Sequence, residues 1–240
     1  MVVCYAAGMR IFVTPLVAGE LTITGDEHHY LHRVRRARVG DALELVDGAG
    51  LRTAAVIERI TGDATVVRAE APSAVVAAPP HVRVLLPLIK GDRMETALEK
   101  LVEVGADSIL LWPATRAVVR LEADRREARV AKYRSALQAG ARQCGRAAVP
   151  TIAAADSLAA ALATLPAGAR LVLDPAADRA AMPTAGDVTL ISGPEGGFAP
   201  DELDTLAAAG FASLGLGPRV LRAETAPVVA VALIRAATGS

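Results

Sequence analysis

From residue 82 onward, short apolar runs alternate with stretches of helical periodicity, and this alternation constrains the fold more than any other feature of the sequence. The apolar runs predict strands at 82–86, 109–112, 171–173, 188–191 and 212–216. Helices are predicted between 92 and 105 and at about 124–141, 157–165, 201–209 and 225–237. Strands that alternate with helices form a mostly parallel sheet, so we predict an α/β fold for this half.

The first of these helices carries a signal at each end. Asp92 and Glu95 have the spacing of a capping box, with Asp in place of the usual Ser or Thr. Gly105 is the expected stop, because glycine readily adopts the left-handed conformation that ends a helix.

The first part of the chain has a different pattern. Short strands are predicted at 10–13, 42–46, 51–60 and 64–69, with turn chemistry at 47–50. Several short strands joined by tight turns are typical of a small barrel. The Ala-, Val- and Pro-rich stretch 71–80 is interpreted as a linker, so we predict domains at 9–72 and 80–240.

Composition excludes several classes of protein. Hydrophobic residues make up 52% of the chain, enough for a full core. The only cysteines, Cys4 and Cys144, cannot form a disulfide framework or a zinc cluster, and we expect no metal. The apolar run 226–234 is too short to span a membrane, and we see no signal peptide. We expect a soluble cytoplasmic protein that starts at Met1 or Met9.

Positive charge is concentrated in two segments although the formal net charge is zero. Residues 116–146 contain nine Lys or Arg against three Asp or Glu. The second segment, 28–38, contains three histidines and four arginines. Both segments are candidates for binding phosphates. The alternative is that each is ordinary solvated surface.

Two turns are candidate ligand sites. The first, 191–198, contains three glycines between a predicted strand and a predicted helix, where open α/β sheets bind ligands. It lacks the Gly-Lys-Ser/Thr of a P-loop. The second, 214–226, contains two glycines, Arg222 and Glu224, and leads into the last helix with Thr225 as a candidate N-cap. The alternatives are a glycine turn without a ligand and a capped loop with a local ion pair.

A family resemblance rests mainly on these two turns. Gly-Pro-Glu-Gly-Gly-Phe stands at 193–198, and Leu-Gly-x-Arg-x-Leu-Arg-x-Glu-Thr-Ala stands at 216–226. Together they resemble the motifs of the RsmE family, SPOUT-class methyltransferases that modify N3 of a uridine in 16S ribosomal RNA. Weaker similarity continues at 90–95, 100–105, 115–119 and 143–146, and in the first domain at His29, Val34, Arg36, Gly40, Asp41, Asp47 and Gly48. The chain departs from the pattern at Arg35, Ala117, Ala139, Arg142 and Cys144.

The resemblance implies a PUA-like barrel followed by a domain with a deep trefoil knot. It also implies a homodimer that takes S-adenosylmethionine as cofactor and 16S rRNA in the small ribosomal subunit as substrate. The implied cofactor-binding residues are Leu173, Gly193, Glu195, Gly197, Leu216, Gly217, Leu221 and Thr225. The implied RNA-binding residues are Arg10, Arg33, Arg36, Lys90, Arg116 and Gln143.

The chemistry of methyl transfer suggests roles for three further residues. The uridine imide must lose its proton, and a cation beside O2 or O4 would stabilise the anion. Arg222 and Arg146 are the candidates for this cation. Glu224 is either the proton acceptor or an ion-pair partner that positions Arg222, and the sequence leaves both open.

Three other functions stay open at this point. The chain could methylate another RNA base or a ribose hydroxyl on the same fold. It could be an RNA-binding protein with a PUA-like module and no catalysis. It could also be a nucleotide-binding α/β protein unrelated to RNA.

Overall fold

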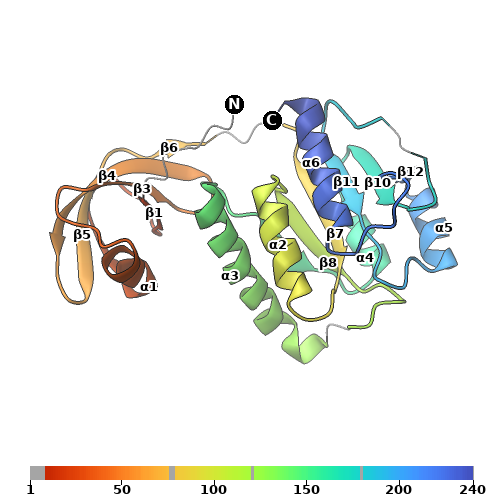
Figure 1. Cartoon of the computed structure of the whole chain (residues 1–240), viewed down its shortest axis with the longest axis horizontal. Helices are drawn as coiled ribbons and strands as arrows, with labels where there is room; N and C mark the ends of the chain where they lie inside the picture. The colour runs from red at the N-terminus through yellow and green to blue at the C-terminus, as the bar shows by residue number, and fades with distance from the viewer. Residues whose placement is uncertain (1–8, 76–78, 120–121, 179–180, 240) are drawn as a thin grey trace. The chain divides into compact units, whose positions relative to one another are not determined.

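The structure, a computed structural model, describes residues 9–75, 79–119, 122–178 and 181–239 (Figure 1). The contacts divide the chain into two compact units. The N-terminal unit comprises the residues up to 77 together with 141–149, and the C-terminal unit comprises 78–140 and 150–240. The first eight residues, with Cys4 and the choice between Met1 and Met9 as the start, lie outside the described residues.

The N-terminal unit is built on a mainly antiparallel sheet. Its strands are β1 (Met9–Phe12), β2 (Gly19–Thr24), β3 (Ala42–Val46), β4 (Leu51–Ile60), β5 (Ala64–Ala69) and β6 (Ser73–Ala74). The order is β1-β3-β4-β5-β2, with β6 paired to β4, and only the β1–β3 pairing is parallel. The predicted bounds of β3, β4 and β5 are confirmed. The interpretation of 71–80 as a linker is wrong at β6, whose two residues continue the sheet.

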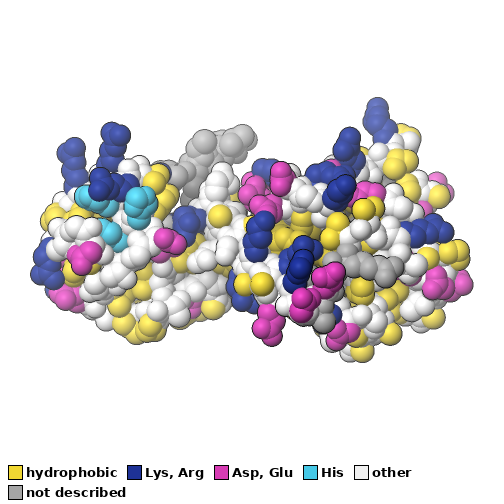
Figure 2. Space-filling model, turned by 90° about the horizontal axis from the view of Figure 1, so that it is seen from below, with side chains coloured by type: hydrophobic (Ala, Val, Ile, Leu, Met, Phe, Trp, Pro, Cys, Tyr) yellow, Lys and Arg dark blue, Asp and Glu magenta, His cyan; other side chains and the backbone are white. Residues whose placement is uncertain are grey.

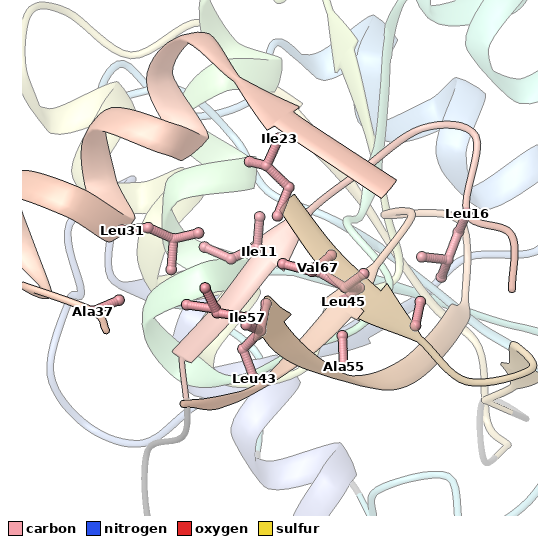
Figure 3. Close-up of a cluster of buried hydrophobic side chains, with 11 residues drawn as sticks. Ile11, Leu16, Ile23, Leu31, Ala37, Leu43, Leu45, Ala55, Ile57 and Val67 are labelled. Carbon is pink, nitrogen blue, oxygen red and sulfur yellow. The ribbon is translucent and has the colours of Figure 1, made fainter. Parts of the chain in front are cut away.

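Alternation along the strands places one face of this sheet in a core. In β4, Thr53, Ala55 and Ile57 are buried while their neighbours are exposed, as the period of two in a strand requires. Ile11 and Leu45 from neighbouring strands pack into the same cluster (Figure 3). Each large apolar side chain that is fully buried stabilises the fold by about 1.5–3 kcal/mol.

Residues 141–149 pack with the N-terminal unit because Arg142 anchors them. Its guanidinium lies over the rings of Phe12 and Tyr30, 5.4 and 5.5 Å from their centroids, and forms an ion pair with Glu27. Burial raises the pKa of the Glu27 carboxyl above its usual value, and Arg142 lowers it in part. The contacts therefore group these residues differently from the continuous 80–240 domain expected from the sequence.

The C-terminal unit is an α/β structure with a parallel sheet, as predicted. Its strands are β7 (Val82–Pro87), β8 (Ser108–Trp112), β9 (Thr151–Ala154), β10 (Ala169–Leu173), β11 (Val188–Ile191) and β12 (Ala212–Leu214). They lie in the order β12-β10-β11-β7-β8-β9, and every pairing is parallel. All four residues of β11 are buried, which is typical of a parallel sheet covered on both faces.

Helices cover the two faces of this sheet (Figure 1). They are α2 (Arg93–Glu103), α3 (Arg126–Cys144, after the 3₁₀ turn η2 at Ala123–Arg125), α4 (Leu158–Ala163), α5 (Pro200–Ala208) and α6 (Ala226–Thr238). Ala161 of α4 and Leu206 of α5 share a buried cluster with Ile191 of the sheet. Helix α6 packs on β7 and β11 and against α2. No helix among the described residues is long and apolar enough to cross a bilayer.

The helix ends follow the predicted signals only in part. The capping box at Asp92 and Glu95 is wrong: Asp92 has helical dihedrals (φ −65°, ψ −16°) and makes no side-chain cap, whereas a capping residue needs extended backbone. The stop at Gly105 is confirmed, with φ +99° directly after the C-cap. Ser157 caps α4 by accepting a hydrogen bond from the Ala160 N–H at 3.0 Å.

Candidate active site

A cavity of about 610 Å³ opens at the carboxyl ends of β10, β11 and β12. Such edges of parallel sheets are where α/β proteins bind ligands, and the volume is that of a small-molecule site. The turns that follow β11 and β12 both line the cavity. The two strands are not neighbours, because β10 lies between them and contributes Leu173 and Asp174 to the wall.

The first turn requires its glycines for geometric reasons. A Cβ on Gly193 would lie 3.0 Å from the Phe198 ring, and one on Gly196 would lie 3.1 Å from the Arg116 carbonyl oxygen. Gly197 has φ +71° and donates its N–H to the Pro194 carbonyl at 2.9 Å. The backbone of this turn is therefore held in place by contacts within the turn and with Arg116.

The second turn is held in the same way. A Cβ on Gly215 would lie 1.9 Å from the Ala177 carbonyl oxygen, and its N–H donates to the Asp178 carbonyl at 3.0 Å. Gly217 has φ +120° and open space beside it. Apolar side chains from this turn and from β10 make one wall of the cavity: Leu173, Leu214, Leu216 and Leu221.

Four charged side chains form a network at the cavity. Arg93, at the start of α2, lies 3.1 Å from Glu195 and 3.8 Å from Glu224. Glu224 also lies 4.0 Å from Arg222. The Glu224 side chain is only 13% exposed, whereas that of Arg222 is 76% exposed. The network therefore joins a buried carboxylate to an arginine that solvent or substrate can reach.

Comparisons with known proteins agree with this geometry. Residues 77–235 match the family model of an RNA methyltransferase domain, and residues 23–69 match an RNA methyltransferase PUA domain. The Mycobacterium bovis ribosomal RNA small subunit methyltransferase E is 34% identical over 88% of this chain and 84% of its own length. The chain belongs to this family. The Bacillus subtilis member is 26% identical over 90% of each chain.

A solved structure of the methyltransferase E family shows the same fold. The protein from Neisseria gonorrhoeae, bound to S-adenosylmethionine, superimposes with a TM-score of 0.84 at 25% identity, covering 95% of this chain and 97% of that one. The family resemblance inferred from the two glycine motifs is confirmed.

The methyltransferase E motifs converge on the cavity. The predicted residues that line it are Leu173, Gly193, Glu195, Gly197, Leu216, Gly217, Leu221 and Arg222. Glu224 lies beside it through the charged network. Thr225 does not line it; it stands at the N-cap position of α6, where its side chain makes no capping bond. Arg146 belongs to the N-terminal unit and is not among the lining residues.

Arg93, Ser192 and Asp174 are among the lining residues that were not singled out from the sequence as cofactor ligands. Arg93 lies inside the 90–95 similarity, so the motif could have indicated it, but its position between two glutamates depends on the fold. The Ser192 hydroxyl is 2% exposed and has no partner among the described residues. Asp174 directly follows β10 and accepts a hydrogen bond from the Ala176 N–H at 2.8 Å. Its position directly after a predicted strand could have indicated it from the sequence.

The predicted RNA-binding residues are divided between the units. Lys90 and Arg116 are exposed in the C-terminal unit, and Arg33, Arg36 and Gln143 are exposed in the N-terminal unit. Arg116 donates to the Gly196 carbonyl at 3.4 Å, beside the first turn. Arg10 is mostly buried and forms an ion pair with Glu44, so its charge already has a partner.

The segment 28–38, which we call the basic turn, covers the end of α1 (Gly25–His29) and the π-helical turn η1 (Tyr30–Val34). Figure 2 shows histidines beside Lys and Arg side chains on one face. His28 is not available to a phosphate: it is 6% exposed, and its Nδ1 lies 2.9 Å from the Thr65 hydroxyl. Arg33 and Arg36 project outward, and Arg36 holds φ +52°, which is rare for a residue with a side chain.

The other basic segment, 116–146, is partly neutralised within helix α3. Arg126 pairs with Asp156, Lys132 lies 2.6 Å from Glu95, and Arg142 pairs with Glu27. The positive charges of these three side chains are therefore already paired with carboxylates of the protein before any RNA is present. Among the described residues, no group of three or more His, Cys, Asp or Glu is arranged to hold a metal ion.

Proposed function

We propose that this protein methylates N3 of a uridine in 16S rRNA of the small ribosomal subunit, with S-adenosylmethionine as donor. The observation that carries the proposal is the single cavity lined by both glycine motifs of the methyltransferase E family. A relative of the same fold binds S-adenosylmethionine. Relatives named for small subunit rRNA support the substrate.

The residues of the cavity fit this cofactor. Leu173, Leu216 and Leu221 provide an apolar wall for adenine. The partnerless Ser192 hydroxyl and the Asp174 carboxylate offer polar partners for ribose hydroxyls. The Cβ positions of Gly197 and Gly217 face open space, so a ligand can approach the backbone there. Gly193 adds backbone to the wall, and Glu195, which is paired with Arg93, adds a carboxylate. Thr225 is left out of the proposed set because it does not line the cavity.

When bound, the sulfonium cofactor supplies an activated methyl group, so the chain mainly has to align the uridine and stabilise its charge. Arg222 lines the cavity with an exposed guanidinium, and we assign it to the developing charge on O2 or O4. Glu224 lies between Arg93 and Arg222, which favours the role of an ion-pair partner that positions Arg222. Arg146 is a second candidate for the same cation.

The finer features of the fold belong to the same proposal. We assign a closed PUA-like barrel to residues 9–72 and a trefoil-knotted domain to residues 80–240, with 141–149 packed on the former. β1 and β2 stand at the two ends of the N-terminal sheet order, where closure would join them. We further propose a homodimer in the cytoplasm, and light scattering of the purified protein at twice the monomer mass of 24.7 kDa is the expected result.

The RNA is held by exposed cations outside the cavity. Arg33 and Arg36 of the basic turn are proposed to contact phosphates, together with Lys90, Arg116 and Gln143. Arg10 is assigned a weaker part because Glu44 already pairs with it. The target base would leave the RNA stack to reach the cavity.

The experiment that tests the function uses small subunits from cells that lack this gene. They are incubated with the protein and labelled S-adenosylmethionine, and the rRNA is digested to nucleosides. We expect the label in 3-methyluridine. Label in a ribose or in another base would support a different RNA target, and binding of RNA without any transfer would support a non-catalytic protein.

A further inference from the structure

The C-terminal unit contains a second cavity, of about 340 Å³, beyond the carboxyl ends of β8 and β9. Trp112, the last residue of β8, lines this cavity, and so does Ala155, which directly follows β9. Arg126, at the start of α3, completes the wall together with Val119. None of these residues lines the cofactor cavity.

One wall connects the two cavities. The Trp112 ring stacks on Phe198, with centroids 5.8 Å apart and planes 12° apart, and Phe198 lines the cofactor cavity. The Thr115 N–H donates to the Glu202 carboxylate at 2.7 Å, so the segment after β8 is tied to α5. The stacked rings of Trp112 and Phe198 would therefore separate a ligand in the second cavity from the cofactor cavity.

Two residues that line the second cavity carry buried hydrogen-bond donors without acceptors. The Trp112 side chain is 1% exposed, and its indole N–H has no hydrogen-bond partner among the described residues. The Nε–H of Arg126 is likewise buried without a partner, while its Nη1 pairs with Asp156. Buried donors lose free energy when they stay unpaired. A cavity lined by apolar side chains together with Arg126 and Asp156, and with such donors in its wall, suits a flat ligand with carbonyl oxygens, such as a pyrimidine base.

We propose that this cavity is a subsite for a nucleobase of the RNA that flanks the target uridine. The inference rests on the proposed function, because it assumes an RNA substrate at the neighbouring cavity. Single-stranded RNA is read in this manner, with bases splayed out, placed against aromatic side chains and hydrogen-bonded at their edges. The volume suits one base with its sugar, whereas the cofactor cavity is nearly twice as large.

Trp112 is the single tryptophan of the chain, so its fluorescence reports on this cavity. The intact protein, first saturated with S-adenosylmethionine, is titrated with uridine 5′-monophosphate. We expect saturable quenching of Trp112 emission. The absence of quenching, or quenching that occurs only without S-adenosylmethionine, would overturn the subsite, since the nucleotide would then bind nowhere or in the cofactor cavity.

A pair of adjacent valines provides a matched control. Val119 lines the second cavity, whereas Val118 is 68% exposed and does not. Val119→Phe should abolish the quenching and raise KM for RNA by about tenfold, the scale of a lost base contact, with an unchanged Kd for S-adenosylmethionine. Val118→Phe should behave as wild type in all three measurements.

The outcomes separate this inference from the proposed function. If wild type transfers methyl groups and Val119→Phe has a normal KM and normal quenching, the subsite is wrong and the function stands. If wild type transfers no methyl group to RNA, the function fails, and the fluorescence titration still decides whether the cavity binds a nucleotide.

Discussion

The cofactor cavity and the basic turn use opposite means to bind. The cavity is formed by backbone at strand ends and by buried groups such as Ser192, 2% exposed, with the mostly buried Glu224, 13% exposed, beside it. The basic turn presents the exposed side chains of Arg33 and Arg36 on a short helical segment. Groups fixed in a shielded site act strongly and specifically, whereas exposed cations contribute small, salt-dependent increments. Substitutions in the two regions should therefore differ in size, in the step affected and in salt dependence.

The largest effect is expected at Arg222. Arg222→Ala should lower kcat by about 10²–10³-fold, the usual cost of losing one preorganised group that stabilises transition-state charge. The Arg222 side chain is 76% exposed, so its removal should not change the fold. Single-turnover methyl transfer measures the effect, and Arg222→Lys, which keeps the charge without the planar fork, should recover part of it. Near-normal turnover of Arg222→Ala would refute the assignment.

A glycine substitution should act on the cofactor instead of on turnover. Gly197 and Gly210 have similar left-handed backbone, φ +71° and +79°, and each has open space at its Cβ position. Only Gly197 lines the cavity. Gly197→Val should weaken S-adenosylmethionine binding by about tenfold or more by filling the ligand's space, whereas Gly210→Val carries the same backbone strain and should keep normal affinity. Calorimetry with S-adenosylmethionine measures the affinity of both variants, and equal affinities would contradict the assignment of this cavity to the cofactor.

The cofactor cavity was also easier to predict from the sequence than the basic turn. Its two turns follow strands whose apolar runs are local signals, and the predicted strand 188–191 agrees with β11 in both bounds. Gly197 and Gly217 are required by positive φ, and Gly193 by its contact with Phe198 in the same turn, whereas Gly196 and Gly215 meet backbone from elsewhere in the chain. Local sequence therefore carried most of the information needed to place this site.

Partners of charged side chains were not predictable, because they come from distant parts of the chain. Arg142 pairs with Glu27, 115 positions away, and Arg93 meets Glu195 and Glu224 only after the sheet has formed. His28 was grouped with the surface charges, yet it is buried against Thr65. Charge counted along a sequence does not tell whether a carboxylate from elsewhere will neutralise it.

Arg36 should show the intermediate effect expected of the basic turn. Its φ of +52° raises the free energy of the folded state by about 1–2 kcal/mol for any residue with a side chain. A glycine removes this strain but loses more backbone entropy on folding, which costs about 0.5–1 kcal/mol. Arg36→Gly should therefore keep or raise the thermal midpoint while it weakens RNA binding several-fold. The slope of log K against log salt should fall by about one. Unchanged RNA affinity at low salt would show that the turn does not contact phosphate.

The smallest effect is expected at Lys132 in α3. Its ammonium lies 2.6 Å from Glu95, and the side chain is 69% exposed. Because this cation is already paired, Lys132→Ala should change RNA affinity by less than about twofold and leave the salt slope unaltered. Filter binding over a range of salt concentrations, run beside Arg36→Gly, makes the comparison. A larger loss for Lys132→Ala than for Arg36→Gly would reverse the contrast between the two basic segments.

The central claim is that the turns after β11 and β12 together enclose one methyl donor. Isothermal titration of the wild-type protein with S-adenosylmethionine, beside Gly197→Val from the first turn and Gly217→Val from the second, tests it most directly. The account predicts one site per chain in wild type and binding weakened by about tenfold or more in both variants. A wild-type protein that takes up no cofactor, or variants from either turn that bind it normally, would contradict the account.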